Sequence, residues 1–462
     1  MNQSVMPLHS AAELIDRYDL SGPRYTSYPT APQMREDFAE VELLNALARS
    51  VRLQRPLSLY FHLPFCQSLC YYCGCNKVVT QKRQRVLAYL RRLEQEMADY
   101  AALLGSHRPV RQLHWGGGTP SYLSDDEMHL LMQMTRRHFH LADDDSGDFS
   151  VEIHPGQTAP STLGVLRELG FNRVSMGVQD FDEKVQAAVN RHNSRAQVEQ
   201  LMTQLRRHQF RSVNMDLIYG LPHQSAESFA HTLEVVQALR PDRISLFNYA
   251  HMPERFNSQR LIHTEHLPSP AQKLEIFTEA LDRLTDSGYI HIGMDHFALP
   301  DDELAVAQRE GRLQRNFQGY VVHNHCDLLG LGVSSISSVG DVYWQNTRRI
   351  DTYQQRLDQG KLAVERGKTL SRDDQIRRYV ISELICHFSL SFAELQYRFG
   401  IDPFMYFAPE LAELNRLAKD RLLTLDSKGI SVSGHGRLLI RRICMVFDTY
   451  LADSQVVYSR VI

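Results

Sequence analysis

The stretch LSLYFHLPFCQSLCYYCGC, residues 57–75, joins an apolar run of strand length to a loop with four cysteines in ten positions. Seven mostly apolar residues that end at a proline are typical of a buried strand. Four clustered thiols after such a strand indicate a disulfide staple, a zinc site or a site that carries electrons. The rest of the sequence discriminates among these three alternatives.

Composition excludes several classes of protein. The 462 residues carry a formal net charge of −3 with 23% charged residues, so nothing draws the chain as a whole to nucleic acid or to an anionic membrane. The N-terminus does not have the pattern of a secretory signal, and no apolar stretch is long enough to span a membrane. Seven cysteines, an odd number at low density, are unlike a secreted disulfide framework. We therefore expect a cytoplasmic protein whose clustered thiols bind a metal.

Strand-like runs alternate with helical patterns through the first two thirds of the chain. The runs are residues 57–63, 110–115, 149–153, 172–178, 212–220, 243–250 and 289–294. The clearest helix follows the first run, where Val86, Leu90, Leu93, Met97, Tyr100 and Leu104 form one apolar stripe. Ser124 and Glu127 have the spacing of a capping box, and Gly170 is a candidate helix C-cap. This alternation predicts an α/β fold with a parallel sheet, either a partial β/α barrel or a doubly wound sheet.

Three segments are expected along the chain. Residues 1–50 read as an irregular N-terminal arm over the active site, and residues 51–365 as the β/α core. Residues 366–462 change to helices followed by a hairpin-like run, which resembles a winged-helix module. Because this segment has no basic stripe, a lid or packing role is favoured over DNA binding.

The unusual residues fall at or just after the predicted strands. The cysteine loop follows the first strand and GGGTP, residues 116–120, follows the second; Glu152 and His154 follow the third. Gln179 follows the fourth strand, and Tyr249 and Ala250 follow the sixth. In a β/α barrel this edge is where active sites are assembled.

Asp216 lies inside the fifth apolar run, where an ionised carboxylate needs a partner. The partner is either a ligand or a buried arginine, and Arg191 is one candidate. A purely structural ion pair between the two is an equally good interpretation of the sequence.

Cys66, Cys70 and Cys73 form a C-x3-C-x2-C pattern on a short loop. A structural zinc site needs four ligands, and because the chain has no second C-x2-C pair, His62 or Cys75 would have to complete it. Three thiolates on a four-iron cluster instead leave one iron open to a ligand. The zinc reading and the iron–sulfur reading both remain open on spacing alone.

The C-x3-C-x-aromatic-C pattern after the first strand resembles the radical S-adenosylmethionine superfamily. The resemblance implies a [4Fe-4S] cluster whose unligated iron binds S-adenosylmethionine, and an electron that cleaves this cofactor to a 5′-deoxyadenosyl radical. The glycines of residues 116–118 resemble the superfamily's motif for the methionyl amino group.

Longer stretches resemble one family in that superfamily, the oxygen-independent coproporphyrinogen III oxidases. They include SGPRYTSYPTA (21–31), NRVSMGVQDF (172–181), GMDHFALPDDELAVAQREG (293–311), DLLGLGVSSIS (327–337) and GRLLIRRICMVFDTYL (436–451). The resemblance implies decarboxylation of two propionates of coproporphyrinogen III to vinyl groups, which gives protoporphyrinogen IX in haem biosynthesis. It further implies two S-adenosylmethionines per active site, a low-potential electron donor such as flavodoxin or ferredoxin, and a monomer.

The same resemblance implies the site residues. The cluster ligands are Cys66, Cys70 and Cys73, with Cys75 as a nearby non-ligand. The first S-adenosylmethionine is expected to contact Tyr60, Tyr72, Gly117, Glu152, Ala250 and Ile336, and the second Gly118, Thr119, Gln179, Arg191 and Asp216. Tyr60, His62 and Arg24 are the predicted catalytic residues. Because the substrate carries four propionates, Arg24, His62 and Arg260 are candidates for carboxylate contacts or proton handling.

Two departures from the family pattern keep other functions open. His154 stands where the family usually has an acid and Gly156 where an arginine is common, and residues 320–326 replace small hydroxyl residues. A divergent paralogue with another substrate, or a haem-binding chaperone of the same family, is therefore an alternative. His323, His325 and Cys326 read as a surface loop and not as a second metal site.

Overall fold

The computed structural model describes residues 17–18, 20–323, 325–451 and 458, which form two compact units. The larger unit comprises residues 34–289 and 325–369. The smaller one comprises the described residues up to Gln33, residues 290–323, and the described residues from Leu370 onward. This grouping differs from the three consecutive segments expected from the sequence, because residues 290–323 join the C-terminal segment and residues 34–50 join the core.

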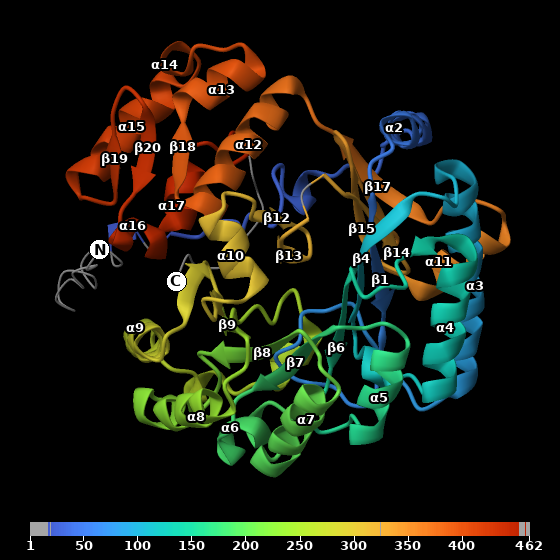
Figure 1. Ribbon diagram of the computed structural model, residues 1–462. Helices are drawn as coiled ribbons and strands as arrows, with labels where there is room; N and C mark the ends of the chain where they lie inside the picture. Colours follow the sequence, from blue (N-terminus) through green and yellow to red (C-terminus); the bar gives the residue numbers. More distant parts are fainter. Residues whose placement is uncertain (1–16, 19, 324, 452–457, 459–462) are drawn as a thin grey trace. The chain divides into compact units, whose positions relative to one another are not determined.

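A mixed sheet forms the centre of the larger unit (Figure 1). Its strand order is β9-β8-β7-β6-β4-β1-β14-β15-β16-β17. The first six strands in this order are β9 (Arg243–Asn248), β8 (Ser212–Tyr219), β7 (Arg173–Gln179), β6 (Asp148–Ile153), β4 (Pro109–Gly117) and β1 (Leu57–Leu63). The others are β14 (Asp327–Leu331), β15 (Ile336–Val339), β16 (Val342–Asn346) and β17 (Val364–Thr369).

In the main sheet each of β1, β4, β6, β7 and β8 lies next to the one that follows it in the order β1-β4-β6-β7-β8-β9, and all of these pairs are parallel. Strand β14 adds a further parallel pair to β1, and β15 to β17 continue antiparallel. The predicted α/β class and the open barrel of parallel strands are therefore confirmed. A parallel order of this kind brings the carboxyl ends of these seven strands to one edge.

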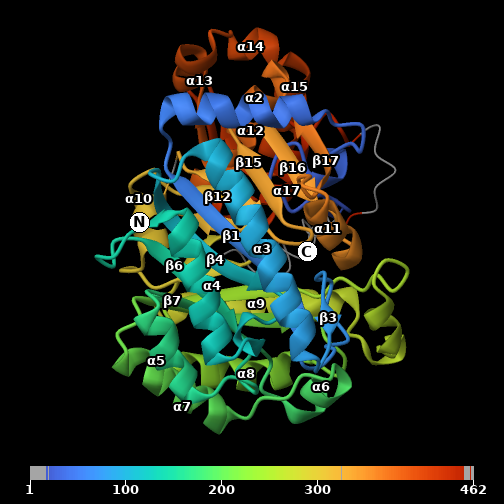
Figure 2. The ribbon, with the colours of Figure 1, turned by 90° about the vertical axis from the view of Figure 1, so that its right-hand side faces the viewer.

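Helices cover the outer face of these strands, and Figure 2 shows α3 (Arg83–Leu104) and α4 (Asp125–His138) in front of β1, β4 and β6. All six residues of the predicted apolar stripe on α3 are buried. Ser124 and Glu127 make the predicted capping box at the start of α4. The other helices of this unit are α2 (Glu40–Leu53), α5 (Pro160–Glu168), α6 (Glu183–Ala188), α7 (Arg195–Arg207), α8 (Ala226–Leu239), α9 (Pro270–Asp286) and α11 (Ile350–Asp358).

The seventh predicted strand, residues 289–294, does not form a parallel pair with another described strand. Strand β10 (Ile290–Gly293) instead pairs antiparallel with β11 (His296–Ala298) within the smaller unit. Gly293 and Met294 both have positive φ, 139° and 54°, so the chain turns back on itself at this point. This tight turn joins β10 to β11 and sets their antiparallel pairing.

The C-terminal part of the smaller unit contains the helices and the hairpin predicted for it. Helices α12 (Arg372–His387), α13 (Phe392–Phe399) and α15 (Ala408–Lys419) accompany a three-stranded sheet. That sheet has the order β18 (Ser389–Ser391), β20 (Gly429–Val432), β19 (Leu423–Leu425). Tyr25 and Tyr28 hydrogen-bond Asp448 and Thr449 in the same unit. Among the described residues, no helix is both long and apolar enough to cross a membrane.

Candidate active site

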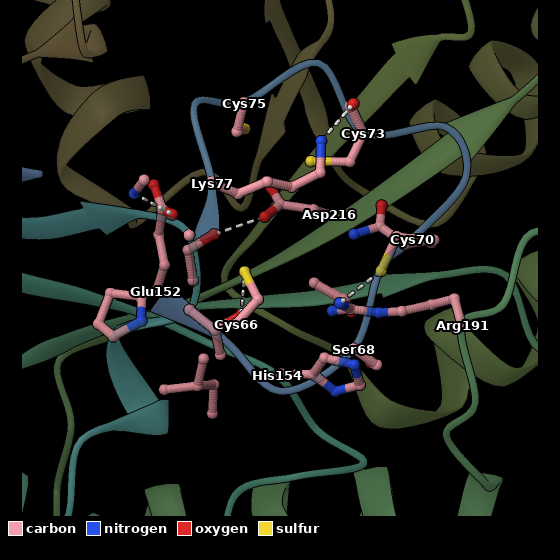
Figure 3. A pocket seen from close by; sticks show the side chains of 18 of the residues that line it. Cys66, Ser68, Cys70, Cys73, Cys75, Lys77, Glu152, His154, Arg191 and Asp216 are labelled. Carbon is pink, nitrogen blue, oxygen red and sulfur yellow. Dashed lines mark hydrogen bonds between the residues drawn. The ribbon is translucent and has the colours of Figure 1, made fainter. Parts of the chain in front are cut away.

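One pocket opens at the carboxyl ends of β1, β4, β6, β7 and β8, as the sequence predicted for the site (Figure 3). Its lining residues are Cys66, Ser68, Cys70, Tyr72, Cys73, Cys75, Lys77, Gly117, Gly118, Thr119, Pro120, Glu152, Ile153, His154, Ser175, Gly177, Gln179, Arg191 and Asp216. Each segment comes from a different strand end, so residues that are distant in sequence share one cavity.

The cysteine loop is fixed at both ends and in the middle. Strand β2 (Phe65–Cys66) pairs with β3 (Val78–Val79), which closes the base of the loop. The Tyr71 amide donates to the Val189 carbonyl at 3.0 Å, and the Asn190 side chain donates to the Leu69 carbonyl at 2.8 Å. The loop is therefore held in shape by protein contacts alone.

The three predicted ligands Cys66, Cys70 and Cys73 all line this pocket (Figure 3). The Thr119 hydroxyl lies 3.5 Å from the Cys66 sulfur, and the Arg191 guanidinium lies 3.6 Å from the Cys70 sulfur. A hydrogen bond from Cys75 lowers the pKa of Cys73 to about 6, although burial opposes this shift. These donors and the positive charge of Arg191 favour the thiolate form that a metal requires, although burial raises the pKa of Cys66 to about 11.

The spacing of these thiols bears on the kind of metal centre that fits. Among the described residues, no three His, Cys, Asp or Glu side chains are gathered tightly enough to hold one metal ion. The three sulfurs are spread around a shared cavity instead (Figure 3). A four-iron cluster is larger than a single ion and fits three separated thiolates better than a mononuclear zinc does.

The glycine run brings backbone close to both the pocket and the cysteine loop. The Gly118 and Thr119 amides donate to the Leu63 and Phe65 carbonyls at 2.8 and 2.9 Å. A Cβ on Gly118 would lie 2.6 Å from the Pro64 carbonyl carbon and 2.8 Å from two carbonyl oxygens. Only glycine therefore fits at this position without a shift of the backbone.

Gly118→Ala is expected to disturb the pocket without removing any polar group. Because the added methyl meets backbone atoms, it should destabilise the fold by about 1–3 kcal/mol and weaken S-adenosylmethionine binding at least about tenfold. Equilibrium binding of S-adenosylmethionine and the Tm of the reconstituted protein test this. Gly434→Ala is the control, since a Cβ there meets nothing within 4 Å. Wild-type affinity and Tm in the Gly118 variant would contradict the expectation.

Glu152 occupies the edge of the pocket above β6. Its carboxylate accepts hydrogen bonds from the Gly117 amide and from His114 Nε2, both at 3.1 Å. Burial alone would raise the pKa of Glu152, but His114 and the amide outweigh burial and hold the pKa below its ordinary value. The side chain is thus an ionised acceptor that faces the cavity.

Asp216 is satisfied by neutral groups, and the candidate ion pair with Arg191 is not formed. Its carboxylate accepts from Ser175 at 2.9 Å and from Asn214 at 2.7 Å. Burial raises the pKa of Asp216 to about 6, since no cation offsets it. Arg191 turns to the Gly177 carbonyl and to Cys70.

Two buried polar atoms in the pocket wall have no hydrogen-bond partner among the described residues. They are Arg191 Nε and Gln179 Oε1. Buried polar atoms rarely stay unsatisfied in folded proteins. Their position on the lining of one cavity indicates that a polar ligand completes them.

Tyr60 and His62 lie on β1 and are absent from the pocket lining. His62 Nε2 lies 2.8 Å from the Asn76 carbonyl, so it is the protonated nitrogen, and Nδ1 accepts from the Tyr60 hydroxyl at 3.1 Å. Burial lowers the pKa of His62, which keeps the ring neutral. Both ring nitrogens are engaged within the protein, so His62 offers no cation to a carboxylate in this geometry.

Of the other predicted site residues, some line this pocket and others do not. Tyr72, Gly117, Gly118 and Thr119 line the pocket, whereas Ala250 and Ile336 do not. Arg24 belongs to the smaller unit, where it pairs with Asp295 at 3.1 Å. Arg260 is exposed and donates to the Pro253 carbonyl at 3.1 Å. Neither His62 nor Arg260 is a lining residue of this pocket.

Several lining residues were missed by the sequence reasoning, among them Ser68, Lys77 and Ser175. Ser175 had a usable signal, because it precedes Gly177 by two residues and so faces the same side of β7. His154, one of the departures from the family pattern, is buried in the lining and accepts the Gly156 amide through Nδ1. A Cβ at Gly156 would lie 2.1 Å from the His192 carbonyl oxygen, so no larger residue fits there.

Comparison with known proteins places this site in a family. Residues 60–236 match the family model described as the radical SAM superfamily, and residues 370–439 match the HemN C-terminal domain. The oxygen-independent coproporphyrinogen III oxidase of Pseudomonas aeruginosa is 54% identical over 98% of both chains. The enzyme of that name from Escherichia coli is 51% identical over 99% of this chain and 100% of its own. The chain belongs to the family of oxygen-independent coproporphyrinogen III oxidases.

A solved structure supports membership of this family of oxidases over the whole length. The coproporphyrinogen III oxidase HemN from Escherichia coli, described as a radical SAM enzyme, superposes with a TM-score of 0.92 at 50% identity. The superposition covers 97% of this chain and 100% of the other. The family resemblance predicted from the sequence is confirmed, and with it the [4Fe-4S] cluster and S-adenosylmethionine as cofactors.

Proposed function

We propose that this protein catalyses the oxygen-independent oxidative decarboxylation of two propionate side chains of coproporphyrinogen III, which gives protoporphyrinogen IX in haem biosynthesis. The observation that carries the proposal is the shared pocket of three loop cysteines, the glycine edge and Asp216. It lies in a chain that matches oxidases of this name from end to end.

Cys66, Cys70 and Cys73 are proposed to hold the cluster and to leave one iron open toward the cavity. When bound, the cluster and S-adenosylmethionine supply the 5′-deoxyadenosyl radical that takes a hydrogen atom from a propionate β-carbon. Cys75 is proposed not to be a ligand, because one residue separates it from Cys73 and a fourth thiolate would close the open iron.

The pocket wall offers two groups of polar side chains, which supports two S-adenosylmethionines. The first group is Glu152 with the Gly117 amide, where a carboxylate can accept from ribose hydroxyls or an amino group. The second is Gln179, Arg191 and Asp216, where a cation, an amide and a carboxylate suit the charged end of an amino acid. Contacts of Tyr60, Ala250 and Ile336 with the first cofactor rest on the family resemblance alone.

Several expectations beyond this site stay predictions. They are the low-potential donor, such as flavodoxin or ferredoxin, the monomeric state, the cytoplasmic location and the roles of the N-terminal and C-terminal segments as arm and lid. Tyr60 and His62 are proposed to act by fixing the end of β1, since their hydrogen bonds join that strand to Asn76 of the cysteine loop.

Anaerobic turnover tests the proposed function. The chain is reconstituted with iron and sulfide, then given reductant, S-adenosylmethionine and coproporphyrinogen III, while 5′-deoxyadenosine and protoporphyrinogen are measured. Both products should form together, and neither should form when S-adenosylmethionine is omitted. If deoxyadenosine never forms, radical chemistry is excluded. Deoxyadenosine without porphyrin product, together with tight haem binding, would favour the chaperone alternative.

A further inference from the structure

Arg348 and Arg255 lie close enough to Arg366 for their charges to act on it, and we call these three residues of the larger unit the arginine cluster. Arg366 is half-buried on β17 and stands opposite Gln345 of β16, to which its Nε donates at 2.8 Å. Arg348 follows β16, and Arg255 lies in the loop after β9. Burial first, and then the nearby charges of Arg348 and Arg255, lower the pKa of Arg366.

Direct hydrogen bonds tie the segments that carry two of these arginines to the cysteine loop. The Asn76 side chain donates to the Arg348 carbonyl at 3.0 Å. On the other side, Ser258 and Gln259 donate to the Cys73 and Tyr72 carbonyls, each at 3.0 Å. Tyr72 and Cys73 themselves line the pocket. The segments that carry Arg348 and Arg255 are thus attached to the cysteine loop at the rim of the proposed active site.

The loop after β9, which carries Arg255, also contacts the cysteine loop through the aromatic ring of Phe256. The Arg255 guanidinium lies 5.6 Å from the centre of the Phe256 ring. A Cβ on Gly74 would lie 3.1 to 3.4 Å from three carbons of that ring, so Phe256 packs directly on the cysteine loop. Arg255 is therefore positioned by a residue that contacts the loop itself.

The positive charge of the cluster is not neutralised by ion pairs. Among the described residues, none of the three guanidiniums forms an ion pair, and only Glu36 and Glu365 lie near enough to influence Arg366. Arg260, on the same loop as Arg255, behaves differently, because Glu254 lies 3.7 Å from its guanidinium. Arg255 and Arg348 are exposed, so their guanidiniums are open to an anionic ligand from solvent.

We propose that the arginine cluster binds propionate carboxylates of the porphyrinogen substrate while another propionate reacts in the cysteine pocket. The inference rests on the proposed function and names a carboxylate-binding edge for its substrate. Planar guanidiniums bind carboxylates with two parallel hydrogen bonds, and a tetracarboxylate has enough anionic groups for several such contacts. These residues take the role that the sequence analysis assigned to Arg24, His62 and Arg260.

Substrate affinity tests the arginine cluster. Arg255→Gln, Arg348→Gln and Arg366→Gln in the reconstituted protein should each raise the KM for coproporphyrinogen III about tenfold, because each loses a charge-assisted contact. The kcat and the slow cleavage of S-adenosylmethionine without substrate should change less than about threefold. Arg207→Gln at the exposed end of α7 removes the same charge elsewhere and serves as the matched control.

Direct binding separates failure of this inference from failure of the proposed function. Fluorescence quenching of coproporphyrin III, a stable tetracarboxylate, should show that the three variants bind it about tenfold more weakly than the wild type and the Arg207 variant. Its tetramethyl ester should bind all four variants and the wild type alike. Normal turnover with unchanged KM and unchanged coproporphyrin binding in the variants would overturn the arginine cluster. Absent turnover with arginine-dependent binding would instead overturn only the reaction.

Discussion

Cys66→Ser, Cys70→Ser and Cys73→Ser should each lose the iron–sulfur cluster, while Cys75→Ser should keep it. All four thiols line one pocket, so position alone does not tell ligands from bystander. Chain geometry distinguishes them, because Cys75 is separated from Cys73 by Gly74 alone and hydrogen-bonds that sulfur. A thiol so placed competes with Cys73 for the same iron and does not reach the open one.

Iron and sulfide analysis after anaerobic reconstitution measures this difference. The wild type and the Cys75 variant should hold about four irons per chain, and the other three variants well under one. Turnover should fall below detection in those three, because the cluster carries the hard chemistry. Cys444→Ser controls for loss of a buried thiol remote in sequence from the loop. Loss of iron in the Cys75 variant to the same degree would refute the division into three ligands and one bystander.

Features set by local sequence could be predicted well. The strands of the βα repeat are continuous apolar runs, and the capping box at Ser124 needs only residues three positions apart. The turn that pairs residues 290–293 with β11 was not predictable, because it depends on positive φ at Met294. Methionine carries no signal for that conformation.

The site could be predicted as a set of strand ends but not as a set of contacts. Asn214 and Asp216 lie two residues apart and face one side of β8, and Ser175 pairs with Asn214 across the sheet. This register supplies Asp216 with neutral donors and leaves Arg191 for the pocket. The sequence contains each of these residues, but the choice among partners depends on the pairing of strands. The arginine cluster was missed for the same reason, since β16, β17 and the loop after β9 meet only in the fold.

Glu96 is a buried carboxylate. Its place on the apolar stripe of α3 could be read from the sequence, but its hydrogen-bond partners could not. It lies three residues after Leu93 and four before Tyr100 on the apolar stripe of α3, and it is fully buried. Its carboxylate accepts hydrogen bonds from the Gly332 amide at 2.7 Å and from Asn346 and Tyr353 at 2.6 and 2.7 Å. Glu96 therefore joins the outer helix to the turn between β14 and β15.

Glu96→Ala should destabilise the fold by about 3 kcal/mol or more, because three buried donors lose their acceptor at once. The Tm of the reconstituted protein, measured anaerobically by scanning calorimetry, tests this. Arg91→Ala on the exposed face of the same helix is the control, since it changes α3 without touching the network. An unchanged Tm in the Glu96 variant would mean that the network contributes nothing to stability.

The pH dependence of stability identifies the charge state of this group. Burial raises the pKa of Glu96 from 4.5 to about 7, even though its three donors oppose the shift. The folded state therefore binds a proton more tightly than the unfolded chain, and the resulting stabilisation, present in full below pH 4.5, is lost as the pH rises toward 7. Glu96→Gln cannot titrate, so relative to wild type it should gain about 3 kcal/mol of stability across this window. Parallel pH profiles of Tm for the two proteins would show that Glu96 stays ionised in the fold, held by its three donors against the cost of burial.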